Sequence, residues 1–161
     1  MKKTKYKNRD SQLEMSGKIV AFYEREFYCF SNFSSFAVKW KGKLWQTSEH
    51  AYQASRFIGK DLKIVQKILK AKSADEAYKI AQKFLGKNFN KYTEEDIKNM
   101  ESILRAKLKQ NLYVIHKLLQ TGNRMIVEDS PKDSFWGWGN NRKGRNELGK
   151  LWMKLRKEIK K

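Results

Sequence analysis

The stretch that decides the fold is W-Q-T-S-E-H-A-Y-Q-A-S-R, which runs from Trp45 to Arg56. Thr47 and Ser48 are favourable N-cap residues, and residues suited to a helix follow them as far as Phe57. We therefore predict that a helix begins at this point. Helical spacing gives the helix two different sides. The polar side carries Glu49, Tyr52 and Arg56. The small, apolar side carries His50, Ala54 and Phe57.

Glu49 falls in the first turn of this predicted helix. A carboxylate there interacts favourably with the helix dipole, which is its ordinary, structural role. Position alone does not make Glu49 catalytic, so a catalytic role needs support from elsewhere in the chain.

A second unusual stretch lies near the other end, D-S-F-W-G-W-G-N-N-R-K-G-R-N-E-L-G-K, from Asp133 to Lys150. It holds two tryptophans, four glycines and three asparagines. Glycine loses backbone entropy on folding, and tryptophan is seldom left to solvent, so this composition is costly for a mere connection. We expect a structured loop here, followed by a last helix that Asn146 caps.

A third feature is Lys107, in a helix that Thr93 opens with Asp96 completing a capping box. Its buried stripe is predicted to be Ile97, Met100, Leu104 and Leu108. At about 100° per residue, Lys107 falls within the arc spanned by Ile103, Met100 and Leu104, at the centre of the apolar face. Either the side chain reaches past a helix edge to water, or it is held against apolar surface with a lowered pKa and serves as a neutral nucleophilic amine.

Composition limits the class of protein. A chain of 161 residues is long enough to bury one core, and its single cysteine, Cys29, excludes an internal disulfide framework. The two histidines lack metal-binding spacing, so we predict no metal and no cofactor. We find no signal peptide and no membrane-spanning run, and we expect a soluble, cytoplasmic protein.

The net charge is strongly positive, at +19, with 36 Lys plus Arg against 17 Asp plus Glu. Such a surplus attracts polyanions, so DNA or RNA is a natural partner. The alternative is a charged surface that serves only solubility.

The chain is predicted to be one domain, residues 18–161, preceded by a flexible basic arm, residues 1–17. Residues 18–23 alternate as a strand, and residues 37–45 are typical of a hairpin that turns at residues 41–43. Amphipathic helices follow, one of them with Leu112, Ile115 and Leu119 in the core, and residues 126–128 form a short strand. The fold class is therefore α+β, mostly helical, with a small N-terminal β-sheet.

The ordered motifs of the chain resemble the NADAR (YbiA-like) family of N-glycosidases, from about Val20 to Lys157. The resemblance rests on F-Y at 22–23, F-S-N-F at 30–33, T-S-E-H-A-Y-Q-A at 47–54, R-A-K at 105–107, T-G at 121–122, D-x-x-W-G-x-G at 133–139 and G-x-N-x-L-G-x-L-x-M-x-x-R at 144–156. The family hydrolyses ribosyl N-glycosidic bonds, on riboflavin-pathway intermediates in some members and on ADP-ribosylated guanine in others. This chain has Tyr92 where family members often have tryptophan.

The resemblance implies three catalytic residues, Glu49, Lys107 and Asp133. It also implies substrate-binding roles for Tyr23, Asn32, Tyr92, Trp136, Gly137 and Asn146. Breaking a ribosyl C–N bond passes through an oxocarbenium-like state, which Glu49 would stabilise or serve by moving protons. Lys107 would attack the anomeric carbon and form a Schiff base, or else bind phosphate or the leaving base.

Asp133 and Trp136 each have two open interpretations. Asp133 would orient or protonate the substrate, or serve only as a local cap in the D-x-x-W turn. Trp136 would stack on a base, worth about 1–3 kcal/mol, or act as a wedge beneath the glycine-rich loop.

Three functions follow from these residues. The first is an N-glycosidase that removes ADP-ribose from guanine in nucleic acid or nucleotides, and the large positive charge favours it over the second. The second is an N-glycosidase of riboflavin-biosynthesis intermediates. The third belongs to another class, a non-catalytic nucleic-acid-binding module, which would need neither Glu49 nor Lys107.

Overall fold

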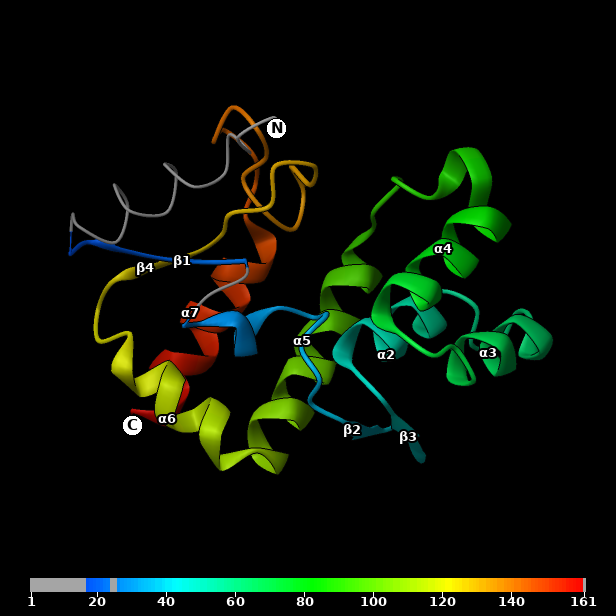
Figure 1. The fold of residues 1–161 in the computed structure, drawn as a ribbon, viewed down its shortest axis with the longest axis horizontal. Coiled ribbons are helices and arrows are strands. Elements are labelled where there is room, and N and C mark those ends of the chain that lie inside the picture. Colours follow the sequence, from blue (N-terminus) through cyan, green and yellow to red (C-terminus); the bar gives the residue numbers. More distant parts are fainter. Residues whose placement is uncertain (1–16, 24–25, 161) are drawn as a thin grey trace, which may run out of the picture. The chain divides into compact units, whose positions relative to one another are not determined.

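A computed structural model describes residues 17–23 and 26–160 of the chain (Figure 1). The predicted basic arm therefore lies outside the described residues, apart from Gly17, and both the arm and the domain boundary at residue 18 stay predictions. The chain divides into two compact units. The central unit is Asn32–Ile115, and the terminal unit combines Met1–Ser31 with His116–Lys161.

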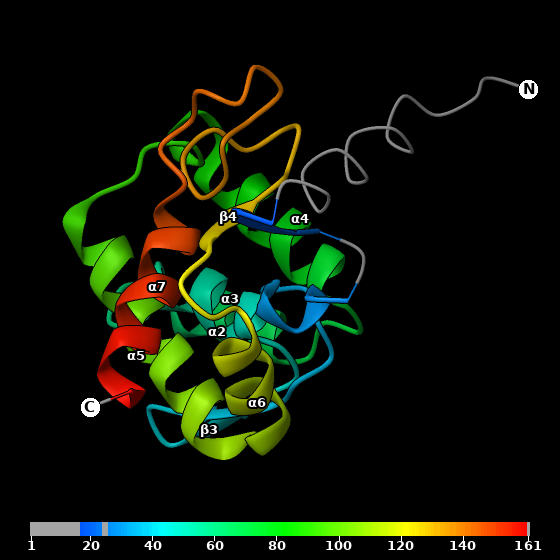
Figure 2. The same cartoon turned by 90° about the vertical axis from the view of Figure 1, so that its left-hand side faces the viewer.

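The terminal unit is built on two parallel strands, β1 (Ile19–Phe22) and β4 (Met125–Glu128). Ile19 pairs with Met125 and Phe22 with Glu128. The helix α7 (Glu147–Ile159) packs against β4, as the two views in Figures 1 and 2 show.

The core of the terminal unit is aromatic. The indole Nε1 of Trp152, in α7, donates a hydrogen bond to the carbonyl oxygen of Phe30, in the short 3-10 helix η1 (Tyr28–Phe30), at 3.0 Å. The two rings lie 5.0 Å apart between centroids. Both side chains are fully buried, so this contact fixes η1 on α7.

The central unit begins with the antiparallel hairpin of β2 (Val38–Trp40) and β3 (Lys43–Trp45). Lys41 and Gly42 make the turn with φ of 46° and 73°, which is the left-handed region that a two-residue hairpin requires. The predicted hairpin is confirmed.

The helices follow in the predicted order, with the boundaries α2 (Ser48–Ser55), α3 (Leu62–Leu69), α4 (Ala74–Leu85), η2 (Gly86–Asn88), α5 (Glu94–Gln110) and α6 (Leu112–Gln120). The capping box of Thr93 and Asp96 is present at the start of α5. Three of the four predicted stripe residues of α5 are buried, and Ile97 is half-buried.

The α+β fold class, dominated by helices, is confirmed. The strands nevertheless form two separate pairs and not one N-terminal sheet, because β1 pairs with β4 from the far end of the sequence. No short-range pattern in the sequence encodes that pairing. Within the described residues, no helix combines the length and the apolar character that a membrane crossing requires.

The predicted buried face of α6 is wrong. Leu112 and Leu119 are 75% and 43% exposed, whereas Val114 and Leu118 are fully buried. Most positions of L-Y-V-I-H-K-L-L are apolar, so two different stripes satisfy helical spacing, and packing selects the second.

Candidate functional site

The helix α2 is buried on all sides. Every residue from Ser48 to Ala54 is buried, because α2 packs against α3, α4, α5 and both strands of the hairpin (Figure 1). The predicted polar side therefore faces the interior as fully as the apolar side does. Polar groups in such a place need partners, so each one is informative.

Thr47 caps the helix as predicted. Its Oγ1 accepts a hydrogen bond from the backbone N–H of His50 at 3.3 Å and lies 2.8 Å from Nδ1 of the same residue. The other ring nitrogen, Nε2, lies 3.1 Å from the carbonyl oxygen of Ala71. A carbonyl only accepts, so Nε2 carries the proton, and burial lowers the pKa of His50 below its ordinary value. His50 is thus a neutral, structural histidine.

Glu49 lies in the first turn of α2 and is only 5% exposed. Its carboxylate Oε1 accepts a hydrogen bond of 2.8 Å from Nε2 of Gln53, one turn further along. Its backbone N–H donates to the carbonyl oxygen of Asn32 at 3.0 Å, which ties the preceding loop to the helix start. A glutamate that served only the helix dipole would not need to be buried with a dedicated donor.

Lys107 lies on the buried face of α5, as predicted, and its side chain is fully buried. Its Nζ donates a hydrogen bond to Oγ of Ser34 at 2.8 Å and lies 5.3 Å from the ring centroid of Phe36. The alternative in which the side chain reaches past the helix edge to water is excluded by this burial. Since α2 packs on α5, Glu49 and Lys107 belong to adjoining helices of one unit.

Several buried side-chain atoms on or beside α2 have no hydrogen-bond partner among the described residues. They are Oδ1 of Asn32, Oγ of Ser48, Oε1 of Gln53 and Nη1 of Arg56. Native proteins rarely leave buried polar atoms unpaired, and each such case needs an explanation. Their gathering around one helix, beside a buried carboxylate, is typical of a site that binds a polar ligand.

Asn32, predicted to bind substrate, is 6% exposed. Its amide Nδ2 makes only a weak contact with the sulfur of Met100, at 3.4 Å. Its Oδ1 has no partner among the described residues. The Oδ1 atom of Asn32 is therefore suited to accept a hydrogen bond from a ligand.

Tyr92, also predicted to bind substrate, is half-buried. The guanidinium carbon of Arg56 lies 5.7 Å from its ring centroid and 5.3 Å from that of Phe89. Nη2 of Arg56 donates to the carbonyl oxygens of Phe89 and Lys91, at 2.8 and 3.2 Å. Arg56 therefore fastens the segment before α5 to the end of α2.

The structure places the other predicted residues in the terminal unit: Tyr23, Asp133, Trp136, Gly137 and Asn146. Tyr23 follows β1 and is 38% exposed. Asp133 accepts two hydrogen bonds at one carboxylate oxygen, Oδ1, from the backbone N–H groups of Phe135 and Trp136 at 2.8 and 2.7 Å. This geometry is that of the local cap that the D-x-x-W turn made possible.

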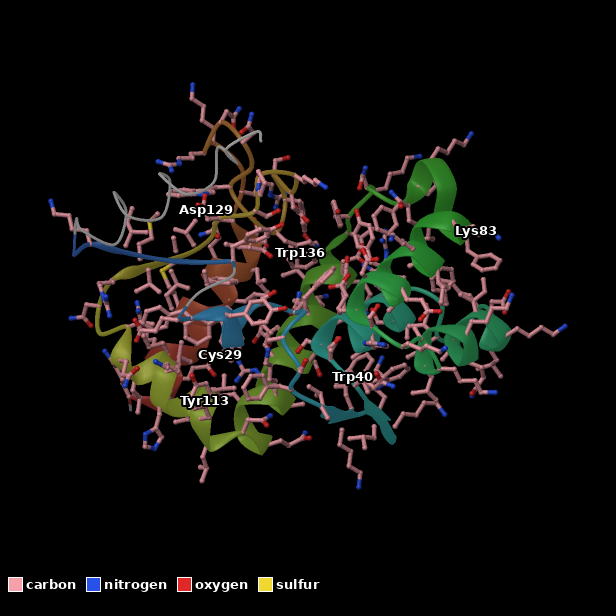
Figure 3. The ribbon with its side chains drawn as sticks, viewed as in Figure 1. Cys29, Trp40, Lys83, Tyr113, Asp129 and Trp136 are labelled. Carbon is pink, nitrogen blue, oxygen red and sulfur yellow. The ribbon has the colours of Figure 1, made fainter. Side chains whose placement is uncertain are left out.

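Trp136 and Gly137 lie in the segment between β4 and α7, in which Figure 3 labels Trp136 and Asp129. Trp136 is 5% exposed. A Cβ on Gly137 would lie 2.6 Å from the carbonyl oxygen of Glu128, so only glycine allows this close backbone approach.

Asn146 occupies the N-cap position of α7, in the left-handed region with φ of 52°, yet its side chain makes no capping bond. Its amide instead donates to the carbonyl oxygen of Ile126 at 2.9 Å and accepts from the N–H of Glu128 at 3.0 Å. Asn146 is thus the N-cap residue of α7, as predicted, but no capping bond forms from its side chain because β4 takes both polar atoms. This bonding favours a structural role for Asn146 over contact with substrate.

Two residues of the site, Gln53 and Ser34, escaped the sequence reasoning. Gln53 is one helical turn from Glu49, so the i, i+4 spacing was a usable signal. Ser34 gave no signal, because its partner Lys107 is far away in the sequence. Within the described residues, no group of three or more His, Cys, Asp or Glu side chains is placed to hold a metal ion.

A buried carboxylate that accepts from an amide and a buried amine that donates to a hydroxyl lie on adjoining helices. Groups of these kinds suit the binding and cleavage of a sugar derivative. The carboxylate can stabilise positive charge in a site that excludes water, and the amide and hydroxyl groups can bind sugar hydroxyls.

Known proteins are similar to this chain in sequence and in fold. The NADAR domain matches residues 21–160. The chain is 35% identical to N-glycosidase Npun_R5314 of Nostoc punctiforme, over 87% of this chain and 92% of that protein. It is also 35% identical to Riboflavin biosynthesis protein VVA0006 of Vibrio vulnificus, over 87% of this chain but only 38% of that longer protein.

The fold has a counterpart among solved structures. The NMR structure of the Escherichia coli protein YbiA superimposes with a TM-score of 0.76 and 33% sequence identity, covering 89% of this chain and 85% of that one. The sequence match, the shared fold and the ordered motifs agree, and the chain belongs to the NADAR domain family.

Proposed function

We propose that the protein hydrolyses a ribosyl N-glycosidic bond and, more specifically, removes ADP-ribose from guanine in nucleic acid or nucleotides. The broader class, a hydrolase acting on N-glycosyl bonds, follows from membership of the family and from relatives that are named N-glycosidases. The observation that carries the proposal is the buried carboxylate of Glu49, held by Gln53 at 2.8 Å beside buried polar atoms that have no partner in the described part of the chain.

Glu49 has the surroundings that the reaction requires. As the C–N bond breaks, positive charge develops at the sugar, and a carboxylate fixed in a water-poor site stabilises that charge without having to reorient. A 5% exposed carboxylate with a neutral amide donor meets this need. Glu49 can also move a proton to or from the attacking group.

Lys107 is the proposed nucleophile. Its Nζ is fully buried and fixed by Ser34, so the amine is held in one direction. In the proposed route the neutral amine attacks the anomeric carbon, the base leaves with a proton, and ring opening gives a Schiff base that water hydrolyses. In the alternative route Lys107 binds phosphate or the leaving base, and Glu49 activates water.

The remaining predicted residues take supporting roles in the proposal. In the central unit, Asn32 contacts the sugar or phosphate and Tyr92 contacts the base. In the terminal unit, Trp136 keeps its expected role as a stacking platform, and Tyr23 lies at the exposed end of β1. Asp133 acts through the turn that it caps, because its Oδ1 already accepts two backbone hydrogen bonds. Gly137 and Asn146 shape the backbone near β4.

The choice of substrate rests on charge. A net charge of +19 attracts nucleic acid, and a small phosphorylated metabolite does not require it. The riboflavin-pathway alternative is supported by two relatives named riboflavin biosynthesis proteins. The chain spans only 38% and 25% of those proteins, so the names cover far more sequence than the matching parts.

The decisive experiment assays the purified protein on DNA carrying ADP-ribosylated guanine and on the riboflavin-pathway intermediate side by side. We expect release of ADP-ribose from the DNA and a much lower kcat/KM for the metabolite. The reverse preference would establish the alternative substrate. Binding of nucleic acid without turnover of either compound would instead indicate the non-catalytic module.

Glu49→Gln tests the residue that carries the proposal. The amide keeps the size of the side chain but removes its charge, so kcat should fall at least about a hundredfold while the melting temperature hardly changes. Glu94→Gln is the matched control, because Glu94 is a first-turn glutamate of α5 that is exposed. A Glu49→Gln variant that melts much earlier, with full activity in its folded fraction, would make Glu49 a helix-start residue.

A further inference from the structure

The side chain of Gln53 is the most informative polar group that the proposed reaction does not yet use. It is only 3% exposed, and its two polar atoms are in different situations. Nε2 donates to Oε1 of Glu49 at 2.8 Å, whereas Oε1 of Gln53 is buried and has no partner among the described residues.

Glu49 fixes the direction of this amide. An ionised carboxylate can only accept hydrogen bonds, so the amide must turn its NH₂ group toward Glu49 and its oxygen away. A buried amide oxygen without a donor is unfavourable, and burial beside α2 prevents water from solvating it freely. If Gln53 served only to hold Glu49, burial of its amide oxygen without a hydrogen-bond donor would destabilise the fold and serve no function.

The position of Gln53 indicates what the missing donor is. At about 100° per residue, Glu49, Gln53 and Arg56 lie within about 60° of one another around the axis of α2. In the proposed reaction Glu49 faces the anomeric carbon of the sugar. The groups attached next to the anomeric carbon are the ring oxygen and the 2′-carbon with its hydroxyl, and only the hydroxyl can donate a hydrogen bond.

We propose that Oε1 of Gln53 accepts a hydrogen bond from the 2′-hydroxyl of the ribosyl substrate, while its Nε2 holds Glu49 in place. Gln53 is then both a substrate-contacting residue and a positioning residue, and it selects ribosyl over 2′-deoxyribosyl groups. This inference rests on the proposed function, since it assumes a ribosyl group beside Glu49. It also gives a reason why an enzyme that works on modified DNA would spare the deoxyribosyl bonds of the DNA itself.

The experiment compares two substrates, guanine in DNA modified with ADP-ribose and with ADP-2′-deoxyribose, in the wild type and in Gln53→Met. Methionine keeps the length of the side chain and removes both polar atoms. We expect the wild type to prefer the ribosyl substrate at least about a hundredfold in kcat/KM, because a site built to bind a hydroxyl rejects the analogue that lacks it. In Gln53→Met the preference should fall below about tenfold, mainly through loss on the ribosyl substrate. An unchanged preference in the variant would overturn the proposal.

Two further variants separate loss of the contact with the hydroxyl from loss of stability. Gln53→Glu keeps an acceptor oxygen but replaces the donor with a second carboxylate, so the ribosyl preference should survive while the rate falls. Gln110→Met is the matched control for stability, because Gln110 lies in the same unit and bonds the N–H and carbonyl of Lys39 at 2.8 and 3.0 Å. It should lower the melting temperature and leave the preference unchanged.

A binding measurement separates failure of this inference from failure of the proposed function. Calorimetric titration with ADP-ribose and with 2″-deoxy-ADP-ribose, which lacks the hydroxyl next to the anomeric carbon of the distal ribose, needs no turnover. If the wild type hydrolyses neither DNA substrate, the proposed function fails. The role of Gln53 in binding the hydroxyl is then tested by titration alone, since Gln53→Met should abolish any preference of the wild type for ADP-ribose. Absence of any such preference in the wild type would contradict the role of Gln53 as well.

Discussion

Oγ of Ser34 accepts a hydrogen bond of 2.8 Å from Nζ of Lys107, and both side chains are almost completely buried, at 1% and 0% exposed. The loop before the hairpin thereby reaches the last turn of α5. Burying an amine in an apolar face is unfavourable unless a polar group meets it, and Ser34 supplies that group. The direction of the Lys107 side chain therefore depends on a serine that takes no part in the chemistry.

Ser34→Ala should destabilise the protein and impair the reaction together. It removes an acceptor from a buried amine, so the free energy of unfolding should fall by about 1–3 kcal/mol. Turnover should fall as well, because Nζ loses its fixed direction. Urea unfolding and kcat on the same preparation measure both effects. Ser35→Ala, at the exposed neighbouring residue, should change neither. A Ser34→Ala variant with wild-type stability and rate would show that other contacts hold Lys107.

Lys107 itself should become covalently modified during turnover. If its neutral amine attacks the anomeric carbon, borohydride should reduce the Schiff base and leave an ADP-ribose adduct on the peptide that contains Lys107. Lys109 is exposed and serves as the internal control, since it should stay unmodified. Peptide mass spectrometry measures both.

Lys107→Arg gives an independent test of the same role. Arginine keeps the positive charge but stays protonated and forms no imine, so near-total loss of activity is expected. A milder loss, with no adduct in the wild type, would favour phosphate binding by Lys107 and activation of water by Glu49.

His50 should make stability depend on pH. Burial holds its pKa in the folded state below the ordinary value of 6.5, so the histidine is neutral in both states above that pH. As the pH falls below 6.5, the unfolded chain binds a proton more readily than the folded chain does. The free energy of unfolding should therefore decrease with falling pH until the folded pKa is passed.

Urea unfolding at several pH values between about 7.5 and 5 measures this dependence. His50→Gln should flatten the curve over that window, whereas His116→Gln, at an exposed histidine, should follow the wild type. Parallel curves for the wild type and His50→Gln would assign the dependence to other groups.

Salt should weaken the action on nucleic acid. Each lysine or arginine that contacts a phosphate releases a counterion, so KM for modified DNA should rise at least about tenfold between about 50 and 200 mM salt. Turnover of a free ADP-ribosylated nucleotide should respond far less, because it offers few phosphates. A KM on DNA that is flat over this range would mean that the charge of +19 is incidental to the substrate.

The sequence allowed local features to be predicted better than distant ones. The starts of α2 and α5 could be predicted because the side chains of Thr47 and Thr93 accept hydrogen bonds from backbone N–H groups only three residues further along the chain. The burial of Lys107 was readable because helical spacing fixes its face. The bond from Lys107 to Ser34 was not readable, since it joins segments that only packing brings together.

Asn146 shows how tertiary contacts override a local rule. An asparagine before E-L-G-K is a natural N-cap, but the backbone of β4 offers its amide a donor and an acceptor at once. Two bonds to a buried strand replace one bond to the helix end. The same competition explains why its role in binding substrate stays a prediction.

The pairing of β1 with β4 has a consequence for the order in which the parts of the chain fold during synthesis. Residues 32–115 form a contiguous unit that can fold as soon as α5 and the start of α6 emerge from the ribosome. Ile19, by contrast, is made early and must wait for Met125 before it can pair. An apolar strand is thus left without its neighbour while the whole central unit is translated, which makes β1 the segment most exposed to mispairing in the nascent protein.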